Sequence, residues 1–339
     1  MNKLVLIDGN AILHRAFHAL PPSLTTPDGQ PTNAVYGFVA IILRVIEELK
    51  PTHMAVAFDR PKPTFRKTLF KEYQAHRPKM EDALVSQVDI VHKVVTAMKV
   101  PIFEQDGFEA DDVIGTITEQ VKNRLSRHAE LVSASKAYNK IPKQVRDDGN
   151  YVDEVVVVTG DRDLLQLVNH KVKLFMPVKG LTESKLFGEK EAEERMGVAP
   201  KLIPDLKALM GDASDNYPGV AGIGPKTAVA LLNQFGSVEK LYQHLDQVAN
   251  PSVREKLEKD RDNAMLSHKL ATVVTDAPIK FVPEKAQLAQ DLLTQEVIEL
   301  FGNLGFKTLL KRMGKMMQKE VPGETKPIKK MDERQMELF

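Results

Sequence analysis

Three acidic residues within four positions mark the stretch FEADDVIG, residues 108–115. Carboxylates this close repel one another, so Glu109, Asp111 and Asp112 need a partner that offsets their charge. The first turn of a helix would satisfy one or two of them, because its free N–H groups and the positive end of its dipole favour acids. A divalent cation would satisfy all three, since carboxylate oxygens suit Mg²⁺ and Mn²⁺. The positions of the other acids decide between capping and metal binding.

Further acids follow three short apolar runs. KLVLID, HMAVAFD and EVVVVTGD end in Asp8, Asp59 and Asp161, and a weaker run, VPIFE, precedes FEADDVIG. Their alternation with amphipathic segments predicts an α/β fold with a mostly parallel sheet and crossover helices. Parallel strands present their carboxyl ends at one edge, so these acids would meet there together with Asp163. One such aspartate alone is more often a turn or cap residue. Seven acids at one edge would repel strongly without cations, which favours metal binding.

Composition and charge exclude several other classes of protein. The chain of 339 residues has no cysteine, which rules out disulfides, thiolate zinc sites and thiol catalysis and fits a reducing compartment. His14 and His18 are four residues apart but lack an HExxH pattern, so a helix packed on the sheet explains them better. The net charge of +1 identifies no partner. The first apolar run is too short for a signal peptide or a membrane span, so we expect a soluble cytoplasmic protein with no membrane contact.

Residues 60–80 are strongly basic and contain aromatic side chains. Seven lysines and arginines stand against the single acid Glu72, with Phe65, Phe70 and Tyr73 between them. Such a run is usually a solvated face. Here it follows Asp59 directly, and cations attract phosphates while aromatic rings stack on unpaired bases. We therefore expect this segment to meet a nucleic acid at the acidic edge.

Residues 211–241 add two acids and a glycine turn. Asp212 and Asp215 precede GIGPKT, which opens an amphipathic helix. The turn lacks the third glycine of a dinucleotide-binding fingerprint and does not match a Walker loop. Backbone N–H groups at a helix start, beside Lys226, suit a nucleic-acid phosphate, although a simple helical corner explains the turn equally well. Acids, basic segment and glycine turn together predict a nuclease.

The ordered motifs carry a family resemblance. LIDGN, FD followed by FR, EADD, TGDRDLLQL, GDASDN and GIGPKTA occur in the order found in bacterial 5′ nucleases. Over residues 1–314, with one interruption, the chain resembles the 5′-3′ exonuclease domain of bacterial DNA polymerase I, a relative of the flap endonucleases. Because no polymerase domain follows, the resemblance is to a stand-alone form. It implies a PIN-like sheet with flanking helices, a helical arch over the active site and a C-terminal helix-three-turn-helix DNA-binding region.

This resemblance sets the expected domains. We expect a catalytic core over residues 1–180, with the arch at about 60–80 and an insertion at about 127–150. A DNA-binding region would follow at 181–314 and a flexible tail at 315–339. The insertion joins the helix that starts at EADD to the strand that ends in Asp161. That helix rises about 1.5 Å per residue and would carry its far end roughly 20 Å from the catalytic edge. We expect the insertion to be a surface loop without a function.

The implied activity is that of a divalent-metal-dependent, structure-specific 5′-3′ exonuclease and flap endonuclease in primer removal and DNA repair. Its partners would be DNA with 5′ flaps, nicks or RNA–DNA primers, and its products would carry 5′-phosphates. Two Mg²⁺ ions about 4 Å apart, replaceable by Mn²⁺, would generate hydroxide and stabilise the leaving 3′ oxygen. The metal ligands implied by position are Asp8, Asp59, Glu109, Asp111, Asp112, Asp161, Asp163, Asp212 and Asp215. The implied catalytic residues are Lys71, Tyr73 and Arg77, and the implied DNA-binding residues are Arg66, Gly222, Gly224, Lys226 and Thr227.

One departure from the family concerns the arch. The family pattern is Tyr-Lys-x-x-Arg, whereas this chain reads YQAHR, with Gln74 in place of the lysine. Arg77 is retained. Lys71 lies three residues before Gln74 and would share its face in a helical arch, so it is the expected substitute.

The sequence leaves two alternative functions open and suggests one protein partner. A phosphatase or phosphotransferase with an aspartyl nucleophile would also use Asp8, but it needs neither glycine turn nor arch. A catalytically weak DNA-binding scaffold docked on the sliding clamp fits Gln74 but has little use for so many acids. The terminal QMELF resembles the Gln-x-x-Leu-Phe peptide that docks in the bacterial sliding clamp, with Gln335, Leu338 and Phe339 as contacts. A chance apolar terminus explains it equally well.

Overall fold

A six-stranded sheet forms the centre of the protein. The computed structural model describes residues 1–137, 151–179 and 183–318. The strand order is β3-β2-β1-β4-β5-β6, and every neighbouring pair is parallel except β5 and β6. This confirms the predicted mostly parallel α/β sheet. The strands are β1 Lys3–Asp8, β2 His53–Ala57, β3 Ile102–Phe103, β4 Glu154–Val158, β5 Val172–Lys179 and β6 Glu183–Phe187.

The central strands are buried on both faces, which explains their unbroken apolar sequences. In β1, Leu4 and Leu6 pack into one hydrophobic cluster, while Val5 and Ile7 pack into another on the opposite face. Side chains alternate between the faces of a strand, so each run serves two cores at once. Strand β6 lies at the edge and is mostly exposed. Its sequence, ESKLF, therefore lacks the apolar signal of a strand.

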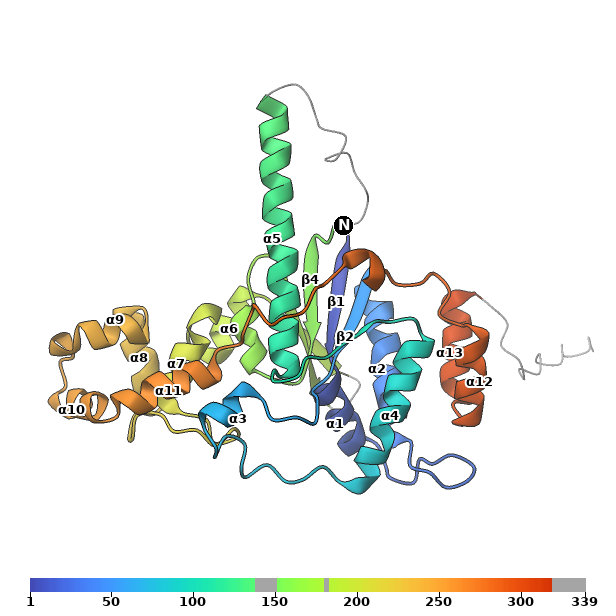
Figure 1. Cartoon of the computed structure of the whole chain (residues 1–339), viewed down its shortest axis with the longest axis horizontal. Coiled ribbons are helices and arrows are strands. Elements are labelled where there is room, and N and C mark those ends of the chain that lie inside the picture. Colours follow the sequence, from blue (N-terminus) through green and yellow to red (C-terminus); the bar gives the residue numbers. More distant parts are fainter. Residues whose placement is uncertain (138–150, 180–182, 319–339) are drawn as a thin grey trace, which may run out of the picture.

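Helices cover both faces of the sheet (Figure 1). Helices α1, α2, α4, α12 and α13 share the cluster that contains Val5, and α5 shares the other cluster with α7 to α11. The helices are α1 Gly9–Ala19, α2 Asn33–Leu49, α3 Phe65–Leu69, α4 Asp82–Ala97, α5 Ala110–Ala137, α6 Glu189–Met196, α7 Ile203–Met210, α8 Pro225–Phe235, α9 Val238–Gln243, α10 Pro251–Lys259, α11 Arg261–Ala271, α12 Gln295–Asn303 and α13 Lys307–Met317. Among the residues that the structure describes, no helix has both the length and the apolar character needed to cross a membrane.

The observed elements cross the expected domain limits. Residue 180 falls between β5 and β6, so the sheet of the core continues to Phe187. Helices α12 and α13 lie within or beyond the expected region 181–314, but they pack against α2 and α4 on the far side of the sheet. Their apolar residues, such as Phe301 and Leu309, are buried there. The helical region beside the sheet therefore comprises α6 to α11, and the C-terminal helices belong to the core.

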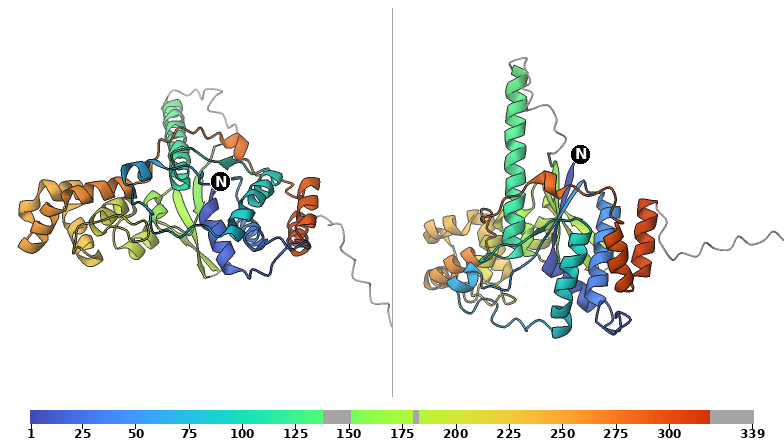
Figure 2. Two further views of the ribbon diagram at one scale, coloured as in Figure 1. Left: turned by 60° about the horizontal axis from the view of Figure 1, so that its bottom comes forward. Right: turned by 45° about the vertical axis from the view of Figure 1, so that its right-hand side comes forward.

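Helix α5 and the arch also differ from expectation. Helix α5 continues to Ala137 and rises out of the body (Figure 2), so residues 127–137 are helical rather than part of a loop. Residues 138–150 lie outside the described residues. The segment 60–80 contains only the five-residue helix α3, followed by turns over residues 71–76. The helical face that Lys71 and Gln74 were expected to share does not form. Gln74 instead adopts a left-handed backbone conformation, with φ of 54°.

Candidate active site

Two of the strand-end aspartates are held in place by local hydrogen bonds. Asp8 ends β1 and caps α1, where its Oδ1 accepts from the N–H of Ala11 at 3.0 Å. Its Oδ2 accepts from the Thr159 hydroxyl at 2.6 Å, just beyond β4. Asp59 follows β2, and its Oδ1 accepts from the N–H of Ala110 at 2.7 Å, at the start of α5. These bonds orient two carboxylates from different strands at the same edge of the sheet.

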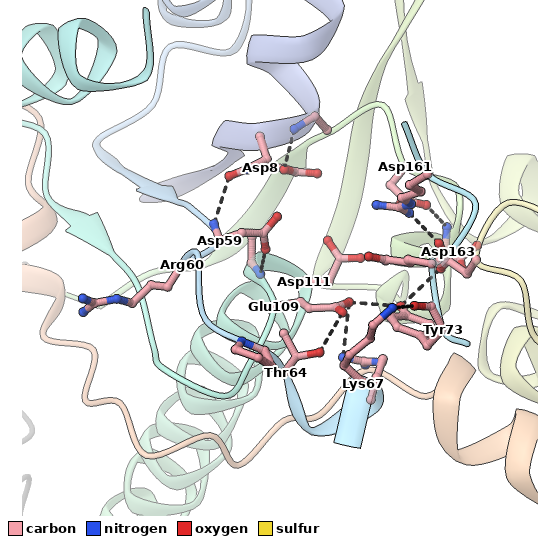
Figure 3. Close-up of a pocket in the computed structure, with 18 of the residues that line it drawn as sticks. Asp8, Asp59, Arg60, Thr64, Lys67, Tyr73, Glu109, Asp111, Asp161 and Asp163 are labelled. Atoms are coloured by element: carbon pink, nitrogen blue, oxygen red, sulfur yellow. Dashed lines mark hydrogen bonds and ion pairs between the residues drawn. The ribbon is translucent and has the colours of Figure 1, made fainter. Parts of the chain in front are cut away.

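The start of α5 separates the three neighbouring acids of FEADDVIG. Glu109 and Asp111 line the same cavity as Asp8 and Asp59 (Figure 3). Asp112 is fully buried and does not line the cavity. Its oxygens accept from both terminal nitrogens of Arg66, at 2.6 and 2.8 Å, and from the backbone N–H groups of Glu109 and Val274. Of the two readings, capping therefore describes Asp112, and a shared ligand fits Glu109 and Asp111.

Arg66 has a buried, structural position. Its side chain is only 3% exposed and, besides Asp112, its guanidinium donates to the carbonyl oxygens of Leu270 and Thr272. The expected DNA contact of Arg66 does not fit this burial. The residue instead ties α3 to the start of α5 and to the end of α11.

We call Asp8, Asp59, Glu109, Asp111 and Asp161 the first acidic group. A second acidic group lies beside it. One carboxylate oxygen from each of Asp163, Asp212 and Asp215 lies within 4.8 Å of the others, an arrangement that could hold a metal ion. Lys207, on α7, pairs with Asp163 at 2.6 Å and also with Asp212. Arg77 pairs with Asp215 at 2.5 Å. The side chains of Lys207 and Arg77 thus supply positive charge to this second group. Sequence reasoning missed Lys207, whose only signal was a single lysine in the mostly apolar IPDLKALM.

The first group is short of positive charge. Burial raises the pKa of Asp8 to about 7, and the charges of Asp59 and Asp161 add to a shift that the hydrogen bond from Thr159 opposes. Burial also raises the pKa of Glu109 to about 7, despite the nearby Arg66. The pKa values of Asp59 and Asp111 are raised as well, again chiefly by burial.

The second group is better balanced by the chain itself. Burial raises the pKa of Asp163 to about 6, against the opposing effect of Lys207. Burial also acts upward on Asp212, but the hydrogen bond and charge of Lys207 outweigh it and leave the pKa of Asp212 below its usual value. The two groups therefore differ in how strongly they need a cation from solution.

The cavity has a volume of about 840 Å³ and lies between the acids and the arch segment. Asp161, Asp163 and Asp215 also line it, so seven of the nine expected metal ligands do so. Asp112 is turned away as described, and Asp212 pairs with Lys207 in the second group without lining the cavity. All the converging donors are carboxylate oxygens, the ligand type that Mg²⁺, Mn²⁺ and Ca²⁺ prefer. The residues present therefore fit divalent cations.

The arch residues divide into two kinds. Tyr73 and Arg77 line the cavity, and so does Gln74 at the position of the family's lysine. Lys71 is exposed and does not line the cavity, so the structure does not support it as the substitute cation. Lys67 does line it and donates to the carbonyl oxygen of Tyr73 at 2.5 Å. Lys67 belongs to α3, and the turn that follows α3 brings the carbonyl oxygen of Tyr73 to it.

The glycine turn lies between α7 and α8, away from the cavity. Gly222 has φ of 75°, and a Cβ there would meet the Nζ of Lys256 at 2.8 Å. The positive φ favours glycine at this position, whereas the flexible end of Lys256 could move aside. Gly224 precedes the first turn of α8, and Lys226 is exposed in that turn, with Thr227 half-buried beside it. The turn presents backbone and basic groups to solvent.

Comparisons with known proteins agree with this fold. Residues 3–146 match the family model of the 5′-3′ exonuclease N-terminal resolvase-like domain, and residues 198–292 match the 5′-3′ exonuclease C-terminal SAM fold. The two matches follow one another in order and together cover more than half of the chain. The chain belongs to the 5′-3′ exonuclease family, as the motifs predicted.

Its relatives include longer proteins. The chain is 42% identical over 312 residues to DNA polymerase I of Bacillus subtilis, an alignment that covers 92% of this chain and 32% of that protein. It is 40% identical over 344 residues to DNA polymerase I of Caldicellulosiruptor bescii, covering 99% of this chain and 36% of the relative. The chain thus spans about a third of the length of the curated relatives it matches.

Two solved structures share the fold. The T5 5′-exonuclease with bound divalent metal ions (zinc) superposes with a TM-score of 0.56 at 20% identity, covering 94% of this chain and 98% of that one. The catalytic core of Rad2 in complex with DNA substrate superposes with a TM-score of 0.53 at 16% identity, covering 92% of each chain. Both confirm the predicted sheet with its adjoining helical region.

Proposed function

We propose that this chain is a divalent-metal-dependent, structure-specific 5′-3′ exonuclease and flap endonuclease that hydrolyses DNA phosphodiesters and leaves 5′-phosphates. The observation that carries the proposal is the convergence of seven carboxylates from separate strands, helices and loops on one cavity. Membership of the 5′-3′ exonuclease family supports it. Primer removal and repair are the processes that need such a cut.

Each of the two acidic groups would form one metal site. Asp8, Asp59, Glu109, Asp111 and Asp161 would hold one Mg²⁺, and the group of three around Asp163 would hold a second, with Mn²⁺ able to replace either. When bound, such ions lower the pKa of a water molecule and neutralise charge on the leaving oxygen. The structure of the relative with zinc carries a divalent ion in the same fold.

Residues of this chain would prepare the site and position the substrate. Thr159 and the N–H of Ala11 fix the two oxygens of Asp8, so its carboxylate needs little reordering to bind a cation. Arg77 and Lys67 of the arch segment line the cavity together with the acids. Their positive charges would attract the scissile phosphate. Arg77 and Lys67 would thus take the role first assigned to Lys71.

DNA binding would extend from the cavity to the glycine turn. Backbone N–H groups at the start of α8, with Lys226 exposed beside them, would hold a phosphate of the duplex. The Nζ of Lys256 lies 3.4 Å from the carbonyl oxygen of Gly222 and adds a second cation at the turn. The substrates would be duplexes with 5′ flaps, nicks or RNA–DNA primers.

The test compares nucleic-acid and small substrates. Purified protein would be mixed with 5′-labelled flap and nicked duplexes, and separately with a small aryl phosphate ester, in Mg²⁺ or in EDTA. We expect Mg²⁺-dependent cleavage of the DNA and no hydrolysis of the ester. Hydrolysis of the ester alone would support the phosphatase reading. DNA binding without cleavage of any DNA substrate would support the scaffold reading.

The C-terminal peptide would add a partner. Gln335, Leu338 and Phe339 lie outside the described residues, so this proposal rests on the sequence QMELF alone. A tether to the sliding clamp would raise the local concentration of the enzyme on primed DNA. Deletion of residues 335–339 should leave basal cleavage unchanged and remove stimulation by loaded clamp. Equal stimulation of both proteins would show that the peptide does not bind the clamp.

A further inference from the structure

The arch segment is fastened to the loop that carries Asp212 and Asp215 of the second acidic group. We call residues 72–77 and 212–217 the clasp. The backbone N–H of Gln74 donates to the carbonyl oxygen of Asp215 at 2.8 Å, and the side-chain amide of Asn216 donates to the carbonyl oxygen of Glu72 at 2.8 Å. Tyr73 stacks on Tyr217 with ring centroids 6.2 Å apart and planes 17° apart. Contacts of three kinds thus hold the two segments together.

The backbone of the clasp has a left-handed residue on both sides. Among non-glycine residues that the structure describes, five have positive φ, and Lys50, Lys99 and Gln318 follow the ends of helices. The other two, Gln74 and Asn216, have φ of 54° and 53° and face each other in the clasp. Asparagine adopts this conformation readily, whereas glutamine does so only where the surroundings enforce it. On the arch side, the clasp is therefore closed by its contacts rather than by local preference.

Asp215 belongs both to the clasp and to the second acidic group. Its Oδ1 pairs with Arg77 at 2.5 Å. Its Oδ2 lies 3.3 Å from the hydroxyl of Tyr73, whose single proton it shares with Oε2 of Glu109 at 3.2 Å. Both oxygens are thus used by the arch. The same carboxylate is one of the three that could hold a metal ion. A divalent cation needs carboxylate oxygen as a direct ligand and repels a guanidinium at the same site.

We propose that Asp215 exchanges partners: without metal it holds the arch segment over the cavity through Arg77 and Tyr73, and a divalent cation bound with Asp163 and Asp212 releases that segment. Release frees Arg77 to meet the phosphate of the substrate. The inference rests on the proposed function, because it takes these three acids as a metal site. Metal binding and access of DNA to the cavity are then coupled.

Lys207 provides an internal comparison. It pairs with Asp163 and Asp212 but not with Asp215, and it belongs to α7 rather than to the arch. Removing the charge of Lys207 should raise the affinity for metal without opening the clasp. Removing the charge of Arg77 should raise the affinity and also loosen the clasp. The exposed pair between Arg77 and Asp215 corresponds to about a two- to fivefold effect on cation affinity.

The experiment uses pairs of spin labels in metal-free protein and in Mg²⁺ without DNA. The chain has no cysteine, so Ala75→Cys with Glu258→Cys labels the arch side of the clasp against α10, and Ala213→Cys with Glu258→Cys labels the loop side. We expect Mg²⁺ to broaden and shift the distance from residue 75 and to leave that from residue 213 unchanged. Arg77→Gln should shift part of the metal-free distribution toward the open distance, and Arg77→Lys should keep it closed. Lys62→Gln, which removes a cation that pairs with Asp106 instead, should stay closed.

Mn²⁺ titration followed by electron paramagnetic resonance separates the two proposals. If Mn²⁺ binds and the distance from residue 75 is the same in all variants and metal states, the exchange at Asp215 is wrong while the proposed function stands. If no Mn²⁺ binds, both fail. Two bound ions, with the weaker one tightened about two- to fivefold by Arg77→Gln and not by Lys62→Gln, support the exchange.

Discussion

Adjacent acids in the sequence have different roles because of contacts distant in the chain. The pattern of strand-end aspartates predicted which carboxylates converge at the edge of the sheet. It could not separate Asp111 from Asp112, since both begin the same helix. The difference comes from Arg66, 46 positions away from Asp112, whose guanidinium occupies that carboxylate. Lys207 and Thr159 were missed for the same reason, since single polar residues in apolar surroundings carry no motif.

Asp111→Asn tests the first acidic group without removing a folding contact. The carboxylate of Asp111 makes no hydrogen bond or ion pair with the residues that the structure describes, and it sits among like charges. We expect the substitution to abolish Mg²⁺-dependent cleavage and to raise the melting temperature of the metal-free protein by a few degrees, since it lowers repulsion. DNA binding should persist. Asp276→Asn, at an exposed acid outside the cavity, is the control and should change neither property. Cleavage near the wild-type rate would remove Asp111 from the site.

The raised pKa values predict a pH-dependent response to metal. Folded Asp8 and Glu109 titrate near pH 7, above their values of 3.8 and 4.5 in the unfolded chain. The folded state therefore binds more protons between these values, so the metal-free protein loses stability as pH rises through about 7. His14 and His53, whose pKa values are lowered chiefly by burial, act oppositely below about 6.5. Comparison at each pH with and without Mg²⁺ cancels the histidine contribution.

We expect the rise in melting temperature caused by Mg²⁺ to be small at pH 5.5 and to grow up to pH 8. The acids must lose their protons before they bind a cation, which gives the sign. Differential scanning fluorimetry in Mg²⁺ and in EDTA measures it. A rise that is constant from pH 5.5 to 8 would mean that the raised acids do not bind the ion.

At the scale of elements, the short helix α3 depends on a buried ion pair. Arg66 is 3% exposed and Asp112 is 0% exposed, and together they join α3, α5 and the end of α11. Removal of one partner leaves an uncompensated buried charge, which costs about 3–5 kcal/mol. Arg66→Met should lower the free energy of unfolding by that amount in urea titrations. The double variant with Asp112→Leu should recover most of it, and Arg77→Ala, at an exposed pair, should cost less than about 1 kcal/mol. A loss at Arg66 as small as that at Arg77 would contradict the structural role.

The turn before α8 is expected to bind phosphate. Lys226→Ala should weaken DNA binding similarly for all sequences and reduce the slope of log affinity against log salt by about 1. Fluorescence anisotropy at several salt concentrations measures both. Lys190→Ala, on α6 and paired with Glu194, is the matched control. Unchanged binding by the Lys226 variant would leave the turn as a helical corner.

Elements were predictable where burial dictates composition. Strands β1, β2 and β4 are apolar because both their faces are covered, and their runs were recognised. The arch was expected to be helical, but contacts to the loop 212–217 hold it in turns, and such contacts cannot be read from local sequence. The docking of α12 and α13 on α2 and α4 was missed similarly. An amphipathic helix shows that it has a buried face and does not show which surface covers it.

At the scale of the molecule, the cavity lies between the sheet edge, the arch and the helical region. Strands deliver Asp8, Asp59 and Asp161, α5 delivers Glu109 and Asp111, and the loop after α7 closes the site. The basic segment and the turn before α8 offer positive charge on either side of it. This arrangement suits a bent or branched duplex whose scissile phosphate enters the cavity.

The most direct test is cleavage of a 5′-labelled flap duplex by the wild-type protein and by Asp111→Asn, in Mg²⁺ and in EDTA, with the cut position and end groups of the products determined. We predict that only the wild-type protein in Mg²⁺ cuts, near the junction, and leaves a 5′-phosphate, while both proteins bind the duplex with similar affinity. Equal cleavage in EDTA, or by the Asp111 variant in Mg²⁺, would contradict the claim that the acids of this cavity perform a metal-dependent hydrolysis.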